Sequence, residues 1–434
     1  MDLLENPFHI LGATPRNNRQ QIIDLADERS LLLDSDACTQ ARSDLTNPRK
    51  RQAAEISWLI GVGPKRSEEL ISGIQDSPSD LLQEKNIPPI ARSNLLSAAM
   101  KRIPAYSHSQ VSKWILELAR SFEDVDIEQV QALINDERIV SGFSEVTELS
   151  EIQSQLNELR RSHVNTIRDT LDKLESSDLV KSVTIAIEVA TEDGNKHGQI
   201  LIDDLVDIYE VEAQEFLRIE GDTIYQLVDE INDIAEKGSS EDLLVKKVFQ
   251  LNKVVRNWDT VAQPIQVSAK SRGLEHEASH EVAAIVRGLA IKLFNEHDEL
   301  GLSQKITEML SEVFAEVVEV AERTAEDIAA LENIADQRSE WIEQASQREE
   351  QWKNEITYKA ELGLVFKDEL SISSEGVKIK SKHFDLAEIT ATRWGATKHT
   401  VNGIPSGTTY KITVGSGRGY ESLEFKNGNV FENF

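Results

Sequence analysis

A metal site is the first chemistry that the residue types of this chain suggest. The segment His276–His280 (His-Glu-Ala-Ser-His) matches the H-E-x-x-H pattern, in which two histidines bind zinc and the glutamate, here Glu277, activates a zinc-bound water. On a helix both imidazoles lie on one face, and Glu296 or His297 could supply a third ligand. Charged rather than apolar residues flank the pattern, which favours a polar helix start. We therefore expect no bound metal and no cofactor.

A phosphate-binding turn is the second candidate, and it comprises Gly61, Gly63, Lys65 and Arg66 within residues 60–71. The segment resembles a helix-hairpin-helix turn, in which glycine amides and a following basic pair hold a DNA phosphate at a helix N-terminus. The alternative is a glycine- and proline-containing loop between two helices. Both interpretations predict a helix on each side of the loop.

The net charge of the chain bears directly on DNA binding. The 76 acidic residues outnumber the 47 basic residues, which gives a formal net charge of -29. Such a field repels phosphate backbones and anionic lipid head groups unless a local basic patch opposes it. We therefore expect no broad nucleic-acid binding, and we interpret the charge as a solvated helix surface.

Cysteine content and hydropathy limit the cellular location. Cys38 is the only cysteine, so an intramolecular disulfide and a cysteine-based zinc site are excluded. The first residues lack a basic segment followed by an apolar one, so we expect no signal peptide. No apolar run approaches the roughly 18 residues of a membrane span, so we expect no transmembrane segment. These features favour a reducing, cytoplasmic location.

The spacing of apolar residues divides the chain into parts of different character. It predicts a compact helical module over 1–60, short helices over 61–145, long helices over 146–354 and a small β domain over 358–434. The expected fold class is therefore mainly α, with a small antiparallel β domain at the C-terminus. Long helices with short breaks pack as a bundle, an α-solenoid or a coiled coil.

Several segments make the helical prediction specific. Gln20–Leu33 ends in three leucines that extend an apolar helix face, and Ile306–Val318 forms the clearest amphipathic stripe. Residues 180–190 are rich in β-branched residues, but their neighbours favour a helix. His163 lies on an apolar stripe and is expected in a core or interface. We expect four tryptophans to anchor helix packing: Trp114, Trp258, Trp341 and Trp352.

Short alternating runs near the C-terminus predict antiparallel strands. Glycine and asparagine lie between the runs, as in tight turns, for example at Asn402-Gly403. Gly415–Gly419 is glycine-rich but joins two such runs, so we expect a hairpin rather than a phosphate-binding loop. The runs are Leu370–Ser373, Val377–Lys380, Tyr410–Val414 and Glu421–Phe425.

The first sixty residues resemble a J-domain of the DnaJ type. Asn6–Gly12 is similar to the opening "-Y-x-x-L-G-" segment, and Ala41–Arg51 is similar to the "A-x-x-x-L-x-D-P-x-x-R" start of the third helix. The resemblance implies a helical module in which Phe8, Leu11 and Trp58 are structural. It also implies a role connected with chaperones.

One departure from the J-domain pattern changes the expected activity. J-domains stimulate DnaK-type chaperones through a His-Pro-Asp loop between the second and third helices. The corresponding region here reads Leu31–Cys38, and the chain contains no His-Pro-Asp. Acidic residues also lie on the second-helix face that would meet the chaperone. We therefore expect the fold without stimulation of a DnaK-type ATPase, and an exposed loop at Asp34–Asp36.

The C-terminal segment Leu370–Phe434 resembles a bacterial PH-like domain. Ser373–Ile379 and Phe384–Ile389 are similar to its opening strands and the turn between them. The usual closing helix is not expected, because the sequence stops just after a strand. The resemblance implies binding of a peptide or a lipid.

These observations favour a non-enzymatic cytoplasmic adaptor that binds a protein partner whose identity the sequence does not specify. Two alternatives stay open. The first is a DNA-associated protein that uses residues 60–71, and the second is a zinc peptidase that uses His276, Glu277 and His280.

Overall fold

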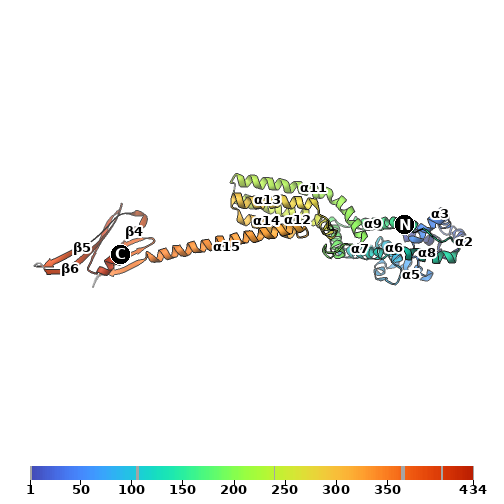
Figure 1. Ribbon diagram of the computed structural model, residues 1–434, viewed down its shortest axis with the longest axis horizontal. Helices are drawn as coiled ribbons and strands as arrows, with labels where there is room; N and C mark the ends of the chain where they lie inside the picture. Colours follow the sequence, from blue (N-terminus) through green and yellow to red (C-terminus); the bar gives the residue numbers. More distant parts are fainter. Residues whose placement is uncertain (1, 104–106, 239, 363–366, 402–403, 434) are drawn as a thin grey trace. The chain divides into compact units, whose positions relative to one another are not determined.

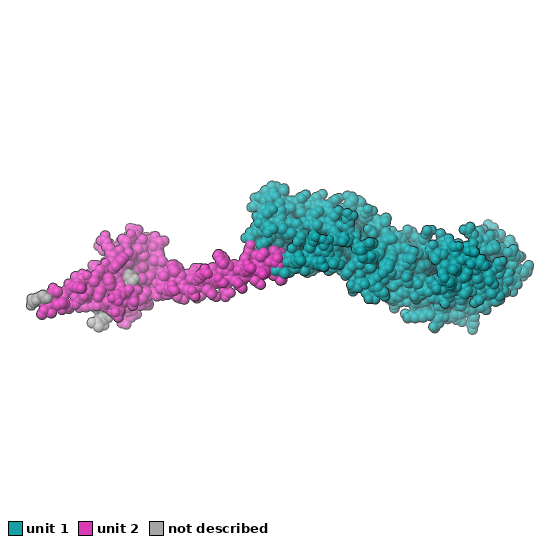
Figure 2. Space-filling view, in the orientation of Figure 1, with its two compact units in different colours: residues 1–329 teal, residues 330–434 magenta. Residues whose placement is uncertain are grey.

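A computed structural model describes residues 2–103, 107–238, 240–362, 367–401 and 404–433. The chain is mainly helical, with a small antiparallel β region at its C-terminus, as the sequence predicted (Figure 1). It divides into two units, Met1–Ala329 and Ala330–Phe434 (Figure 2). The division falls inside one long helix, and the finer boundaries at 60, 145 and 354 stay predictions.

Short helices form the first part of the helical unit. Asparagine side chains start three of them, because Asn6, Asn18 and Asn47 each accept hydrogen bonds from backbone amides in the first turn. The J-like sequence Ala41–Arg51 spans the end of one helix and the start of the next, rather than starting a single helix. The helices are η1 (Leu3–Glu5), α1 (Pro7–Leu11), α2 (Arg19–Arg29), α3 (Ser35–Thr46), α4 (Pro48–Ile56), α5 (Pro64–Asp76), η2 (Pro78–Gln83), α6 (Pro89–Met100), α7 (His108–Glu123) and α8 (Ile127–Ser141).

Longer helices continue the unit, and Trp258, which is 1% exposed, belongs to their core. The Trp258 indole Nε1 donates a hydrogen bond of 3.0 Å to the Leu217 carbonyl, and its ring lies 6.0 Å from the Phe314 ring. Residues 180–190 are helical, as their neighbours indicated. The helices are α9 (Leu149–Leu171), α10 (Ser176–Thr191), α11 (Ile200–Glu236), α12 (Glu241–Ser271), α13 (Glu277–His297), α14 (Leu300–Val313) and α15 (Val318–Glu355).

Three helical predictions need correction. The stripe Ile306–Val318 is not one helix, because α14 ends at Val313 and α15 begins at Val318. The leucines 31–33 do not extend the face of α2, which ends at Arg29, and all three are exposed. Trp114 and Trp258 are buried as expected, but Trp341 and Trp352 on α15 are 70% and 51% exposed and anchor no packing.

Two antiparallel sheets make up the β region of the second unit. The strand orders are β1-β2-β3-β4 and β5-β6-β7, so each sheet is a simple meander. A core cluster of Leu370, Ile379, Ile412, Val414 and Leu423 draws on both sheets. The strands are β1 (Tyr358–Leu362), β2 (Asp368–Ser373), β3 (Gly376–Ile379), β4 (Lys382–Asp385), β5 (Ile389–Val401), β6 (Ile404–Ser416) and β7 (Gly419–Phe425), with η3 (Leu386–Glu388) before β5.

The sequence predicted part of this β region. The four alternating runs lie in β2, β3, β6 and β7, and Gly415–Gly419 makes the expected hairpin turn. The turn predicted at Asn402-Gly403 lies outside the described residues. The expectation of no closing helix is wrong, because α16 (Gly428–Asn433) follows β7 and packs Val430 and Phe431 on the sheet core.

Candidate functional site

A buried aromatic pair organises the N-terminal helices. Phe8 and Leu11 are fully buried, Trp58 is 5% exposed, and the Phe8 and Trp58 ring centres lie 5.7 Å apart. The structural role expected for these three residues is therefore confirmed. Gly12 ends α1 in the left-handed conformation, with φ of 63°, which favours glycine.

A buried ionic network joins residues 1–60 to α8. The Arg51 Nε donates to Glu55 Oε1 at 2.8 Å, and the Arg138 Nη2 donates to Glu55 Oε2 at 2.8 Å. Both Arg51 and Glu55 have fully buried side chains. Arg51 Nη2 also donates to the Pro15 carbonyl at 2.6 Å, and its guanidinium lies 3.8 Å from the centre of the Phe143 ring. One carboxylate therefore ties α4 to α8.

A cavity of about 690 Å³ lies beside this network, between the N-terminal helices and α5. The two loops that the sequence singled out both line it: Leu33 and Asp34 come from the J-like loop, and Gly61 and Pro64 come from the glycine-rich loop. The other residues that line the cavity include both apolar and charged side chains. Apolar side chains include Phe8, Ile10, Trp58, Leu59, Val62 and Ile71, and charged ones include Arg16, Arg29, Glu68 and Glu137.

Three consecutive leucines are exposed next to this cavity. Leu31, Leu32 and Leu33 are 83%, 80% and 48% exposed, and Leu33 also lines the cavity. They follow the C-terminus of α2, where the J-like pattern would place His-Pro-Asp. Asp34–Asp36 is exposed as predicted, but it forms the N-cap and first residues of α3 rather than a loop.

The residues proposed for phosphate binding have structural partners. Gly61 has φ of 75°, and a Cβ there would lie 2.9 Å from Leu133 Cδ2, so the position favours glycine. Gly63 is the N-cap of α5. Arg66 pairs with Glu69 at 3.0 Å and with Glu84, whereas Lys65 is exposed. A phosphate would have to compete with two carboxylates for the Arg66 guanidinium.

The structure brings His276 and His280 to one small cavity, but not through a shared helix face. His276 precedes α13 with an extended backbone, so His276 and His280 do not share a helix face. The His276 ring stacks on Trp258, and burial lowers its pKa. Glu277 is exposed at the first turn of α13, while Glu296 and His297 lie at the other end of this 21-residue helix, roughly 24 Å from His280.

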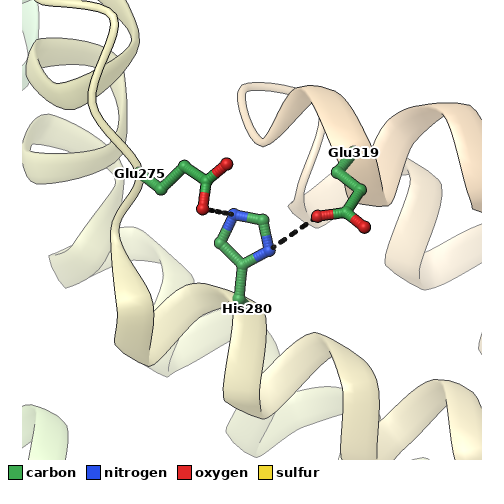
Figure 3. A group of neighbouring side chains, drawn as sticks. All are labelled: Glu275, His280 and Glu319. Atoms are coloured by element: carbon green, nitrogen blue, oxygen red, sulfur yellow. Dashed lines mark ion pairs between the residues drawn. The ribbon is translucent and has the colours of Figure 1, made fainter.

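A different trio surrounds His280 (Figure 3). Glu275 Oε2 lies 3.9 Å from His280 Nε2, and Glu319 Oε2 lies 3.8 Å from His280 Nδ1. One ligand atom from each residue falls within 4.8 Å of the others. Glu275 comes from the loop before α13, His280 from the first turn of α13 and Glu319 from the first turn of α15.

Sequence reasoning missed Glu275 and Glu319. Glu275 lies directly beside the zinc pattern and was passed over because the pattern does not include that position. Glu319 reaches His280 only because the chain turns between α14 and α15, which the continuous apolar stripe concealed.

Within the described part of the chain, no helix has the length and apolar content that crossing a membrane requires. Comparison of the sequence and structure with protein-family models, curated proteins and solved structures found no match.

Proposed function

We propose that this chain is a non-enzymatic, cytoplasmic adaptor that binds a protein partner at the N-terminal cavity. The observation that supports the proposal is the exposed leucine triplet, residues 31–33, at the edge of a 690 Å³ cavity lined by both apolar and charged side chains. Covering one exposed leucine contributes about 1.5–3 kcal/mol, so a partner that covers the triplet gains substantially.

The position of the triplet supports a partner other than a DnaK-type chaperone. In a J-like module, this loop is where His-Pro-Asp would act, and here it offers leucines followed by Asp34. An apolar surface suits contact with apolar side chains of a protein. We expect the purified protein to leave the ATPase rate of a DnaK-type chaperone unchanged in a single-turnover assay. Stimulation by several-fold would contradict this expectation.

The alternatives receive less support from the geometry. For DNA binding, the cation Arg66 is already paired with Glu69 and Glu84. For a zinc peptidase, His276 and His280 do not lie on one helix face. A protein-binding role needs neither arrangement.

We also propose that the β region is a PH-like module. Its four-stranded meander, its three-stranded meander and the closing helix α16 support this proposal. It would give the adaptor a second interaction module at the opposite end of the sequence.

Site-specific photo-crosslinking in the native cell tests the proposal. A photo-reactive amino acid at Leu32 should give a discrete crosslinked protein, and Leu31→Ser with Leu33→Ser should abolish it. The matched control is Val140 on α8, which is 64% exposed and does not line the cavity. No crosslink from position 32, or the same product from position 140, would show that the triplet is not the binding surface.

A further inference from the structure

We propose that Glu275, His280 and Glu319 bind one divalent transition-metal ion of the Zn²⁺ type. This trio differs from the ligand set that the H-E-x-x-H pattern suggested, since only His280 is common to both. The site lies in the helical unit and is independent of the N-terminal cavity. It would link the loop before α13 to the start of α15.

The three residue types suit such an ion, and a rotation of one carboxylate brings all three ligand atoms to it. Imidazole nitrogen and carboxylate oxygen bind zinc at about 2.0–2.2 Å, which places ligands roughly 3.4 Å apart. The carboxylate oxygens lie 3.9 Å and 3.8 Å from the two nitrogens of His280. One ion binds only one nitrogen of the His280 ring, whereas the two carboxylates face different nitrogens. One of the two glutamate side chains must therefore rotate toward the nitrogen that the other faces. The side chains of Glu275 and Glu319 are 78% and 50% exposed, and this freedom permits that rotation.

The ion pair of Glu319 with Arg323 leaves the Glu319 oxygen that faces His280 available to an ion. Arg323 Nη2 donates to Glu319 Oε1 at 2.5 Å, whereas the oxygen that faces His280 is Oε2. Arg323 therefore fixes the carboxylate without occupying the atom that would bind the ion.

A buried amide, that of Gln266, lines the cavity beside the trio. Gln266 is 2% exposed, and its side-chain oxygen Oε1 has no hydrogen-bond partner among the described residues. Its amide nitrogen donates to Ser279 Oγ at 3.0 Å. Gln266 lines the same cavity of about 220 Å³ as Glu275, His280 and Glu319. The side chain of Gln266 also hydrogen-bonds the Asp259 carboxyl, whose pKa burial raises to about 7.

The charge of this cavity favours a cation. Glu275, Glu316 and Glu319 line it, and Lys270 is the one lysine or arginine in the lining. The Lys270 ammonium donates to the Asp193 carbonyl at 3.1 Å. Three carboxylates therefore face one ammonium that already has a partner. A divalent ion would balance this excess of negative charge.

Calorimetric titration of the full-length, chelator-treated protein with Zn²⁺ alone tests the site. We expect one equivalent to bind and the melting temperature to rise as Zn²⁺ is added. Glu275→Gln and Glu319→Gln should each weaken binding by about tenfold or more, and His280→Ala should weaken it further. Circular dichroism verifies that each variant is folded.

Two controls separate this site from the sequence pattern. Glu277→Gln and His297→Ala remove residues of the H-E-x-x-H interpretation and should change the affinity by less than about twofold. Absence of saturable binding would overturn the proposal. So would binding that is unaffected by both His280→Ala and Glu319→Gln, or binding that is lost in Glu277→Gln.

Discussion

His163 should make the stability of the helical unit depend on pH. It lies on α9, is 2% exposed, and contacts Phe122 edge-on, with ring centres 5.6 Å apart. Neither ring nitrogen has a hydrogen-bond partner among the described residues. Burial lowers the pKa of His163 from 6.5 to about 3, because the charged imidazolium would lose its hydration.

The sign and size of the effect follow from this pKa. Between pH 3 and 6.5, the unfolded chain binds a proton at His163 that the native chain does not. Stability is therefore fully present above pH 6.5 and is lost as the pH falls, by about 1.4 kcal/mol per pH unit. From pH 7.5 to pH 5.0, the contribution of His163 amounts to a loss of about 2 kcal/mol.

Urea denaturation of the full-length chain, followed by its helical circular dichroism, measures this contribution. His163→Leu and His163→Gln pack differently, but neither side chain titrates. In both variants, the change in unfolding free energy between pH 7.5 and 5.0 should be smaller than in the wild type by about 2 kcal/mol. An unchanged pH dependence in both His163 variants would refute the reasoning.

Three further predictions concern the ionic network, DNA and the segment where α15 ends and β1 begins. Glu55→Ala leaves two arginines without their shared buried carboxylate and should lower the unfolding free energy by about 3–5 kcal/mol in urea denaturation. An effect below about 1 kcal/mol would contradict the network's role. Duplex DNA should bind weakly at physiological salt, and sub-micromolar affinity unaffected by Lys65→Ala with Arg66→Ala would contradict both views of that loop. Limited proteolysis should cut first between about Gln347 and Lys359, rather than inside the helical body.

Apolar periodicity predicted the fold class well but missed where the chain turns. Phe314 is fully buried against Trp258, so the apolar periodicity of the sequence continues through this residue. The helix α14 nevertheless ends at Val313. Tertiary packing, not local sequence, decides that break. β5 gave no clear signal for a related reason. Most of its side chains are exposed, so burial imposes no alternation of apolar and polar residues along the strand.

The candidate sites were less predictable than the elements that carry them. Arg51 and Glu55 are neighbours on α4, and their spacing alone suggests an ordinary surface pair. Only the fold brings Arg138 of α8 to the same carboxylate and buries all three. The metal trio likewise depends on the turn that carries Glu319 to His280. Contacts between segments far apart in sequence have no signature in a single sequence.

The N-terminal module buries charged side chains and exposes apolar ones, which is the reverse of the usual distribution. Charged groups that normally face water, Arg51 and Glu55, are fully buried, while leucines 31–33 face solvent. The buried charges tie α4 to α8, beside the cavity that Glu137 of α8 helps to line. Leucines 31–33 bury little of their apolar surface in this module, because α2 ends before them at Arg29. Large apolar side chains in a row are a cost to an isolated protein, and a bound partner removes that cost.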